Sequence, residues 1–268
     1  MEESGVKSRH DSPRIAIVGA GNVATHLAMA LRNGGADIIS VSSANPAHAS
    51  ALAARADSVA VPVRDINPDA DFVLIAVADR VVSPVSAELP EIKGIVAHTS
   101  GSVPLETLSA RHKRAAVVYP LQTFSRDVAL DVLQVPFFTE ASDAATLATA
   151  DALVSLMSTH VYHADSQSRR YLHLAGVLTS NFPIYLMQIA ERALQSKGFP
   201  LEVVKPLMEV TVAKAFAVGP EKALTGPARR GDRRVVELQE SMLGNPDDAR
   251  IYHDITTAIL NEYSNEHD

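Results

Sequence analysis

The most constraining feature of the sequence is a glycine turn that joins a short apolar run to a helical pattern. The run is Ile15–Val18, and the turn over residues 19–24 reads Gly-Ala-Gly-Asn-Val-Ala. A strand, Gly-x-Gly-x-x-Ala and a helix in this order are typical of a site that binds the pyrophosphate of a dinucleotide. Gly19 permits the tight turn, Gly21 lets the pyrophosphate approach the backbone, and Ala24 keeps the helix close to the strand.

Two backbone amides complete the predicted anion site. The N–H groups of Asn22 and Val23 stand in the first turn of the expected helix, where they lack helical partners and the helix dipole favours negative charge. We therefore predict that Gly19, Gly21, Asn22 and Val23 bind a cofactor. The alternative is a purely structural turn of small residues.

Strand and helix patterns alternate as far as His163. Strands are expected over 15–18, 38–41, 59–61, 72–77, 95–98, 115–118 and 136–139. A helix is expected after the glycine turn, through Leu27, Leu31 and Gly34, and others over 46–56, 82–89 and 144–157. Continuous apolar strands that alternate with helices are typical of a parallel sheet covered on both faces. The predicted fold class for residues 14–164 is therefore α/β, a doubly wound parallel sheet of the Rossmann type.

Only helical patterns follow Asp165, so residues 165–268 are predicted to form an all-α domain. Helices are expected over 167–197, 201–218, 232–243 and 247–263. Because Pro183 lies inside the first of them, a kink is expected at Thr179–Asn181. The same helix is apolar on nearly every face, more than a small domain can bury, which predicts a homodimer.

Composition narrows the possible chemistry and partners. The 268 residues include 24 Lys and Arg against 31 Asp and Glu, a net charge of −7, which disfavours a nucleic-acid partner. The absence of cysteine excludes disulfides and thiolate chemistry, and no metal site is predicted.

Residues 1–13 lack the apolar core of a signal peptide and are expected to be a disordered lead. No stretch matches the roughly 20 apolar residues of a spanning helix, so we predict a cytoplasmic protein without a membrane partner.

The choice of cofactor depends on the end of the second strand. About 20 residues after the glycines, an acidic side chain would hold the ribose 2′-hydroxyl of NAD. The sequence there is Val-Ser-Ser-Ala-Asn over residues 41–45, with no acid and no adjacent arginine. Since Ser42, Ser43 and Asn45 can donate hydrogen bonds to a 2′-phosphate, NADP is favoured over NAD. The alternative is that they are loop residues facing solvent.

Two further strand ends are expected to face the cofactor, because ligands of open parallel sheets bind outside the carboxyl ends of the strands. Val77 and Ala78 are small enough to let the dinucleotide pass. His98 and Ser100 stand where the nicotinamide is expected, and a ligand-contacting role is predicted for them. The alternative is that Thr99 or Ser100 caps the helix beginning near Pro104 and that His98 is merely hydrogen-bonded in the crevice.

The exit of the sixth strand and the long helix supply other polar candidates. Tyr119, Gln122 and Thr123 either line a substrate pocket or pack in a loop. Arg169 and Arg170 either receive an anion or are solvated.

His173 and Asn181 lie at i and i+8 on the long helix, either in the site or satisfied by internal hydrogen bonds. Farther on, four arginines cluster over residues 229–234 in a glycine- and proline-rich turn. Arg230 in this turn is a candidate for an anion-binding or subunit-crossing role.

These residues together resemble a known bacterial family. They are the 19–24 turn, His-Thr-Ser-Gly at 98–101, Tyr-Pro-Leu-Gln-Thr-Phe-Ser at 119–125, the 172–182 helix and Thr-Gly-Pro-Ala-Arg-Arg-Gly-Asp at 225–232. The chain is similar, from Arg14 to Tyr263, to Rossmann-like proteins with a C-terminal domain of unknown function 2520. The resemblance implies a fold akin to pyrroline-5-carboxylate reductase and to the 6-phosphogluconate and β-hydroxyacid dehydrogenases, with a C-terminal domain of the 6-phosphogluconate dehydrogenase type. It also implies dimers and NADP-dependent oxidoreduction, without a known substrate.

One departure matters for mechanism. The β-hydroxyacid dehydrogenases carry a catalytic lysine four residues before an asparagine on this helix, and here Val177 stands four residues before Asn181. The lysine mechanism therefore cannot be carried over, and His98 or His173 is the candidate proton donor.

The first hypothesis is an NADP-dependent oxidoreductase acting on a small polar or anionic substrate held between the two domains, with His98, Ser100, His173, Asn181 and Arg230 as catalytic residues. The rival is a dinucleotide-binding sensor or regulator without chemistry, and a weaker one is a Rossmann domain with no ligand.

Overall fold

The structure is a computed structural model that describes residues 12–125 and 128–263. The chain divides into two compact units, Met1–Ser180 and Asn181–Asp268, and each is described by itself. The predicted disordered lead over residues 1–13 lies almost wholly outside the described residues. No strand follows His163 in the described residues, and the domain boundary at residue 164 stays a prediction.

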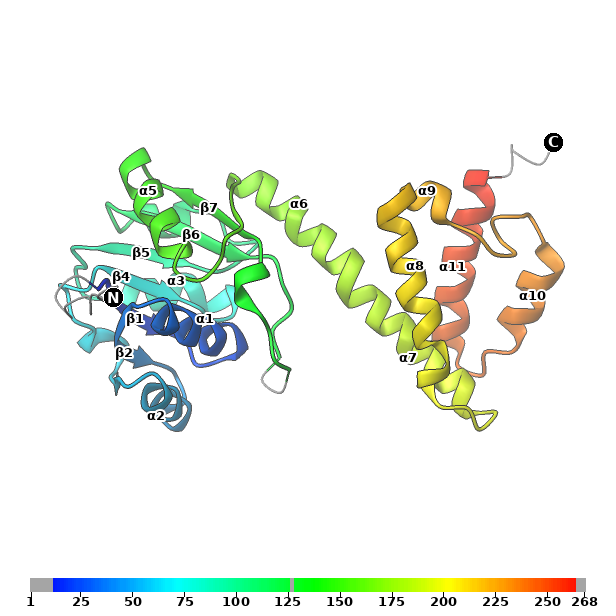
Figure 1. Ribbon diagram of the computed structural model, residues 1–268, viewed down its shortest axis with the longest axis horizontal. Coiled ribbons are helices and arrows are strands. Elements are labelled where there is room, and N and C mark those ends of the chain that lie inside the picture. The colour runs from blue at the N-terminus through cyan, green and yellow to red at the C-terminus, as the bar shows by residue number, and fades with distance from the viewer. Residues whose placement is uncertain (1–11, 126–127, 264–268) are drawn as a thin grey trace, which may run out of the picture. The chain divides into compact units, whose positions relative to one another are not determined.

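The first unit is an eight-stranded sheet with helices on both faces (Figure 1). The strand order is β3-β2-β1-β4-β5-β6-β7-β8. The strands are β1 Arg14–Val18, β2 Asp37–Ser42, β3 Val59–Ala60, β4 Phe72–Ile75, β5 Ile95–His98, β6 Ala115–Pro120, β7 Phe137–Ala141 and β8 Val161–His163. The helices are α1 Asn22–Asn33, α2 Pro46–Arg55, α3 Asp79–Glu88, α4 Glu106–Ser109, α5 Ala144–Val154 and α6 Ser166–Gly176, with short 3-10 turns at Val63–Asp65 and Val132–Gln134.

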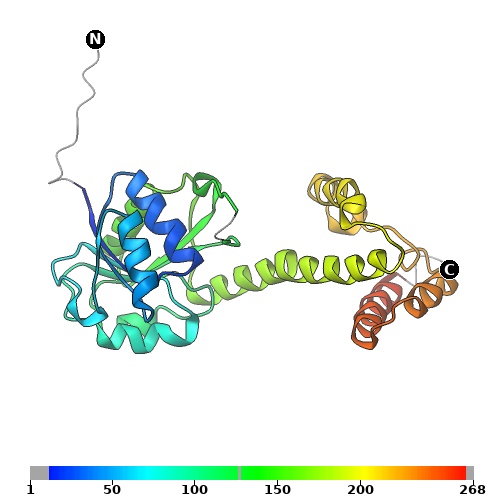
Figure 2. The same cartoon turned by 90° about the horizontal axis from the view of Figure 1, so that it is seen from below.

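Alternate side chains of each central strand supply two cores, one on each face of the sheet. Ile15 and Ile17 of β1 pack with residues of α1, α2 and α5, whereas Ala16 and Val18 pack with residues of α3 and α4. Figure 2 shows α1 and α2, in blue, on the same face of the sheet. A strand buried on both faces reads as continuously apolar, which is why the sequence predicted these strands well.

The predicted all-parallel sheet needs one correction. β7 runs antiparallel to β6, while the other neighbouring strands are parallel. A parallel return requires a crossover, usually a helix, and residues 121–136 between these strands supply only the turn Val132–Gln134 in their described part. The short strand β8 was not predicted.

The helix containing Pro183 is interrupted where the sequence predicted a kink. α6 passes into a π-helical turn at Val177–Asn181, and α7 then runs over Phe182–Gln195. Proline lacks an N–H, so Thr179 loses its usual helical donor four residues later, and a π turn absorbs the break.

The second unit is helical, as predicted. After α7 come the 3-10 turn Leu201–Val204, α8 Lys205–Val218, α9 Pro220–Ala223, α10 Arg233–Ser241 and α11 Pro246–Tyr263. Its apolar cluster is small, with Ala228, Val236 and Leu260 buried. Arg192 of α7 also donates two hydrogen bonds to the carboxylate of Asp248 of α11, at 2.9 and 2.6 Å.

Many large apolar side chains of this second unit are exposed. They are Phe182, Ile184, Tyr185, Leu186, Phe199, Val203, Leu207, Val210, Val212, Phe216, Val218, Leu238, Met242 and Ile255. None of the described helices is long and apolar enough to cross a membrane. An exposed apolar surface of this extent is characteristic of an interaction face.

Candidate functional site

The glycine turn between β1 and α1 has the backbone geometry that its sequence predicted. Gly19 has φ +122°, and a Cβ there would lie 2.2 Å from the carbonyl oxygen of Ala76. Its N–H donates to the carbonyl of Ser42 at 2.7 Å, so the turn is fixed between β2 and β4. A Cβ at Gly21, by contrast, would meet nothing within 4 Å. Gly19 is therefore required by the fold, whereas the space beside Gly21 is open to a ligand.

A loop that follows β6 is attached to α1 beside this turn. The side-chain amide of Asn22 donates to the carbonyl of Phe124 at 2.8 Å. His26 lies with its ring 5.4 Å from that of Phe124, and its Nε2 is 3.0 Å from the carbonyl oxygen of Ser125. These contacts hold Phe124 over the start of the helix.

The turn, the strand ends and this loop enclose a cavity of about 600 Å³. Predicted cofactor residues that line it are Gly19, Gly21, Asn22, Val23, Ser43, Val77 and Ala78. Its other lining residues are Val18, Ala20, Ala44, Val63, Ala76, Val81, Val85, Thr99, Gln122 and Phe124. We call this cavity the glycine-turn cleft. It opens at the carboxyl ends of β1, β4 and β5, where open α/β sheets bind their ligands.

The end of β2 contributes less to the cleft than the sequence predicted. Ser42 is buried, and Asn45 uses its side-chain oxygen to cap α2, accepting from the N–H groups of Ala47 at 3.0 Å and His48 at 3.3 Å. Ser43 and Ala44 line the cleft. Over residues 42–45 no acidic side chain is present that would repel a 2′-phosphate.

Thr99 lines the cleft, whereas its neighbours His98 and Ser100 do not. His98 is fully buried, and its Nδ1 accepts from the N–H of Ser100 at 3.2 Å. Burial lowers the pKa of His98 to about 4, and Arg169 acts in the same direction, so the imidazole is neutral. Ser100 uses its hydroxyl oxygen to accept from the N–H groups of Ser102 and Val103, at 3.1 and 3.0 Å. Both side chains accept hydrogen bonds from backbone N–H groups of the turn after β5. This resembles the alternative in which they have a structural role.

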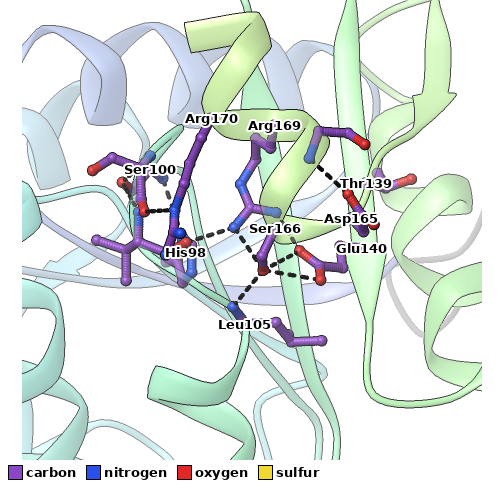
Figure 3. Close-up of polar contacts among 12 residues, drawn as sticks. His98, Ser100, Leu105, Thr139, Glu140, Asp165, Ser166, Arg169 and Arg170 are labelled. Carbon is purple, nitrogen blue, oxygen red and sulfur yellow. Dashed lines mark hydrogen bonds and ion pairs between the residues drawn. The ribbon is translucent and has the colours of Figure 1, made fainter. Parts of the chain in front are cut away.

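Arg169 is neither solvated nor open to an anion, which corrects both sequence expectations for it. It is fully buried, pairs with Glu140 of β7 and donates to the carbonyl of Val103 at 2.5 Å (Figure 3). Ser166 also donates to Glu140, and its oxygen accepts from the N–H of Leu105 at 3.0 Å. This network attaches α6 and β7 to the turn after β5. Arg170, beside it in the sequence, is exposed.

The other predicted catalytic residues lie on helices and turns. His173 of α6 is exposed, and its Nδ1 is 3.2 Å from the hydroxyl of Tyr119, the buried residue near the end of β6. Asn181 and Arg230 are exposed residues of the second unit. The turn containing Arg230 has positive φ at Gly226 and Gly231, as its glycines suggested.

Sequence reasoning missed three features of the site. It treated Tyr119 only as a possible wall, without its partner His173, and it did not connect Arg169 with Glu140. It also overlooked Thr99 and Phe124 as cleft residues. In the described residues, no group of three or more His, Asp or Glu side chains is arranged to hold a metal.

Comparisons with known proteins agree with this geometry. Residues 14–98 match the family model described as NADP oxidoreductase coenzyme F420-dependent, and residues 135–259 match a domain of unknown function, DUF2520. A "putative NADP oxidoreductase" from Bacteroides fragilis is 32% identical, with a TM-score of 0.86, over 95% of this chain and 100% of that one. The chain belongs to this DUF2520 family of NADP oxidoreductases.

More distant structures share the DUF2520-family fold. A protein from Thermotoga maritima is 24% identical, with a TM-score of 0.76, over 94% of this chain and 99% of that one. The pyrroline-5-carboxylate reductase from Streptococcus pyogenes is 16% identical, with a TM-score of 0.63, over 95% of this chain and 100% of that one. No curated protein matches the chain.

Proposed function

We propose that this DUF2520-family protein binds NADP in the glycine-turn cleft and catalyses hydride transfer to or from a small polar or anionic substrate. The observation that carries the proposal is the open space beside Gly21 at the start of α1. A pyrophosphate fits there because the first-turn amides of a helix lack helical partners and attract anions.

Preference for NADP over NAD is supported by the end of β2. The lining residues there are Ser43 and Ala44, and no acid is present to bind a ribose 2′-hydroxyl or to repel a 2′-phosphate. The hydroxyl of Ser43 can donate to a phosphate oxygen. Ser42 and Asn45 have weaker claims, since one is buried and the other caps α2.

The candidate site residues of the first unit have distinct roles under this proposal. Val77 and Ala78 leave room for the dinucleotide, and Thr99 and Gln122 line the part of the cleft beyond the glycine turn. The nicotinamide supplies or accepts the hydride when bound. His173 of α6 is an exposed imidazole that can move a proton, whereas His98 is buried and held neutral.

The second unit is proposed to contribute a homodimer interface and part of the substrate site. The dimer is supported by the apolar side chains that unit 2 leaves exposed. For Asn181 and Arg230 the support is their type, an amide and a cation suited to a polar or anionic substrate, and their exposure. We place the protein in the cytoplasm on sequence grounds alone.

A substrate screen tests the proposal against its rival, a sensor without chemistry. The purified protein is incubated with NADPH and a panel of small ketones, aldehydes and imines, with and without a carboxylate, and the loss of dihydronicotinamide absorbance is followed. Turnover whose KM for NADPH rises about 10-fold in Gly21→Ala supports the proposal. Tight NADPH binding without oxidation across the panel favours the sensor.

A further inference from the structure

Tyr119 and His173 form a pair whose contact has no role in the proposed function so far. The phenolic oxygen lies 3.2 Å from Nδ1 of His173, and the two rings meet edge to face with centroids 6.1 Å apart. Tyr119 is buried, and its ring also contacts Phe138, which in turn stacks on Tyr162. The phenol therefore sits in a fixed position within the first unit, and the imidazole is the more exposed member of the pair.

Gly101 shows how closely the pair is packed. A Cβ at this position would lie 2.8 Å from Cε2 and Cζ of Tyr119 and 2.9 Å from Cβ of His173. A second close approach, at Gly176, would bring a Cβ to 3.1 Å from a methyl group of Leu121. Two glycines thus let the turn after β5, the end of β6 and helix α6 come together at this pair.

The pair lies near the glycine-turn cleft along the backbone. Thr99 is two residues before Gly101, and Gln122 is three residues after Tyr119, and both line the cleft. The buried Arg169–Glu140 pair holds α6, which carries His173, to the turn after β5.

Burial of the phenol favours its protonated form. Burial is the largest cause that raises the pKa of Tyr119; Arg169 acts against it and Asp79 with it. A protonated phenol donates its hydrogen to a neutral imidazole, so Nδ1 accepts and the ring proton resides on Nε2. Within the described residues, no protein group bonds Nε2 of His173.

We propose that Tyr119 is a positioning residue that holds His173 in the Nε2-protonated tautomer, so that Nε2 donates the proton to the substrate's oxygen or nitrogen. This inference rests on the proposed function. As the substrate carbon gains the hydride with its electron pair, the C=O or C=N π pair moves to the heteroatom, which takes the Nε2 proton. The phenol proton passes to Nδ1 in the same step. Solvent then protonates Nε2 as the Nδ1 proton returns to the phenolate, which restores the starting tautomer.

Nitrogen NMR of the histidine-labelled protein, with cofactor absent, tests the positioning. In the wild type at a pH where His173 is neutral, we expect Nε2 to carry the proton and Nδ1 to resonate as an unprotonated acceptor. Tyr119→Phe removes the donor and is expected to give a mixture of tautomers. Tyr171→Phe, the same change at an exposed tyrosine two residues before His173 on α6, is the matched control and leaves the spectrum unchanged.

Two results would overturn the positioning role: a wild-type His173 protonated on Nδ1, or a Tyr119→Phe spectrum equal to the wild type. Gly101→Ala is a second variant, expected to disturb the tautomer because its Cβ would displace the pair. NADPH binding, followed by nicotinamide fluorescence, is measured in parallel. Loss of binding in the wild type would refute the proposed function, whatever the tautomer.

Turnover of any acceptor found in the screen tests proton donation itself. His173→Gln is expected to lower kcat by about 100-fold or more, the usual range for general acid catalysis. Tyr119→Phe is expected to lower kcat about 10-fold and to shift its pH profile, with KM little changed. A Tyr119→Phe enzyme with an unaltered kcat and pH profile would exclude the relay.

Discussion

The two units of the molecule bury their apolar residues to different degrees. In the first, β4, β5 and β6 are buried along their whole length, and cores on both faces of the sheet are closed by helices of the same unit. In the second, the apolar cluster around Ala228, Val236 and Leu260 is small, while Phe216 is 90% exposed. The first unit is self-sufficient in its core, whereas the apolar surface of the second needs another surface to cover it.

Two ion pairs show the same contrast, one in each unit, and each joins elements that are distant in the sequence. Arg169 is wholly buried against Glu140, whereas Arg192, bonded to Asp248, keeps 44% of its side chain exposed. Arg169→Met is expected to lower the free energy of unfolding by about 3–5 kcal/mol, because it leaves a carboxylate without its buried partner. Arg192→Met is expected to cost less, since much of the Arg192 side chain lies in solvent. Urea denaturation measures both, and equal losses would contradict the contrast.

His98 provides a pH test of the closed first unit. Its pKa of about 4 in the folded protein lies below the ordinary 6.5, so the unfolded chain binds the proton more readily between these values. Stability is therefore unaffected by this group above pH 6.5 and falls as the pH drops toward 4, by about 3 kcal/mol in total. His98→Gln should remove this part of the pH dependence. Urea denaturation of both proteins from pH 8 to 4 measures it, and parallel curves would show that His98 is not buried neutral.

The apolar surface of the second unit is tested by charge. Phe216→Asp is expected to raise the dissociation constant of the proposed homodimer about 100-fold, equivalent to roughly 3 kcal/mol. Val59→Asp, an exposed valine of the first unit, is the matched control and should leave the assembly unchanged. Light scattering coupled to gel filtration reports the mass of each. A wild-type monomer, or a dimer that tolerates Phe216→Asp, would contradict this use of the surface.

Substitution of Gly21 tests the proposed ligand site of the first unit, and its expected change in free energy is the smallest of these. Gly21→Ala adds a methyl group in open space where the pyrophosphate is proposed to approach, so NADPH binding should weaken about 10-fold, or roughly 1.4 kcal/mol. Gly244→Ala, also in open space but in the second unit, is the control. Both variants should keep the wild-type melting temperature. Equal NADPH affinity in the two variants would remove the glycine turn from the site.

The features that the sequence predicted are those with local causes. The alternation of strands and helices, the glycine turn and the break before Pro183 each follow from a few neighbouring residues. The predicted direction of β7 was wrong because it depends on the connection from β6, which lacks a helix in its described part. The Arg169–Glu140 and Tyr119–His173 contacts join residues 29 and 54 positions apart, and no local pattern indicates which polar residues will meet.

Within the candidate site, backbone-determined residues were predicted better than side chains. Gly19, Gly21, Val77 and Ala78 line the cleft because strand ends and turns dictate their place. Thr99 lines the cleft in place of the predicted His98 and Ser100, since side chains alternate in direction along the strand. The turn after β5 uses the side chains of His98 and Ser100 in its own hydrogen bonds.

The most direct test of the central claim is a titration of the purified protein with NADPH and, separately, with NADH, following nicotinamide fluorescence. The absence of tryptophan keeps the protein's own emission low. We expect saturable binding of both nucleotides, with NADPH bound more tightly, and weaker binding in Gly21→Ala. Absence of binding to either nucleotide would contradict the assignment of the glycine-turn cleft as an NADP site.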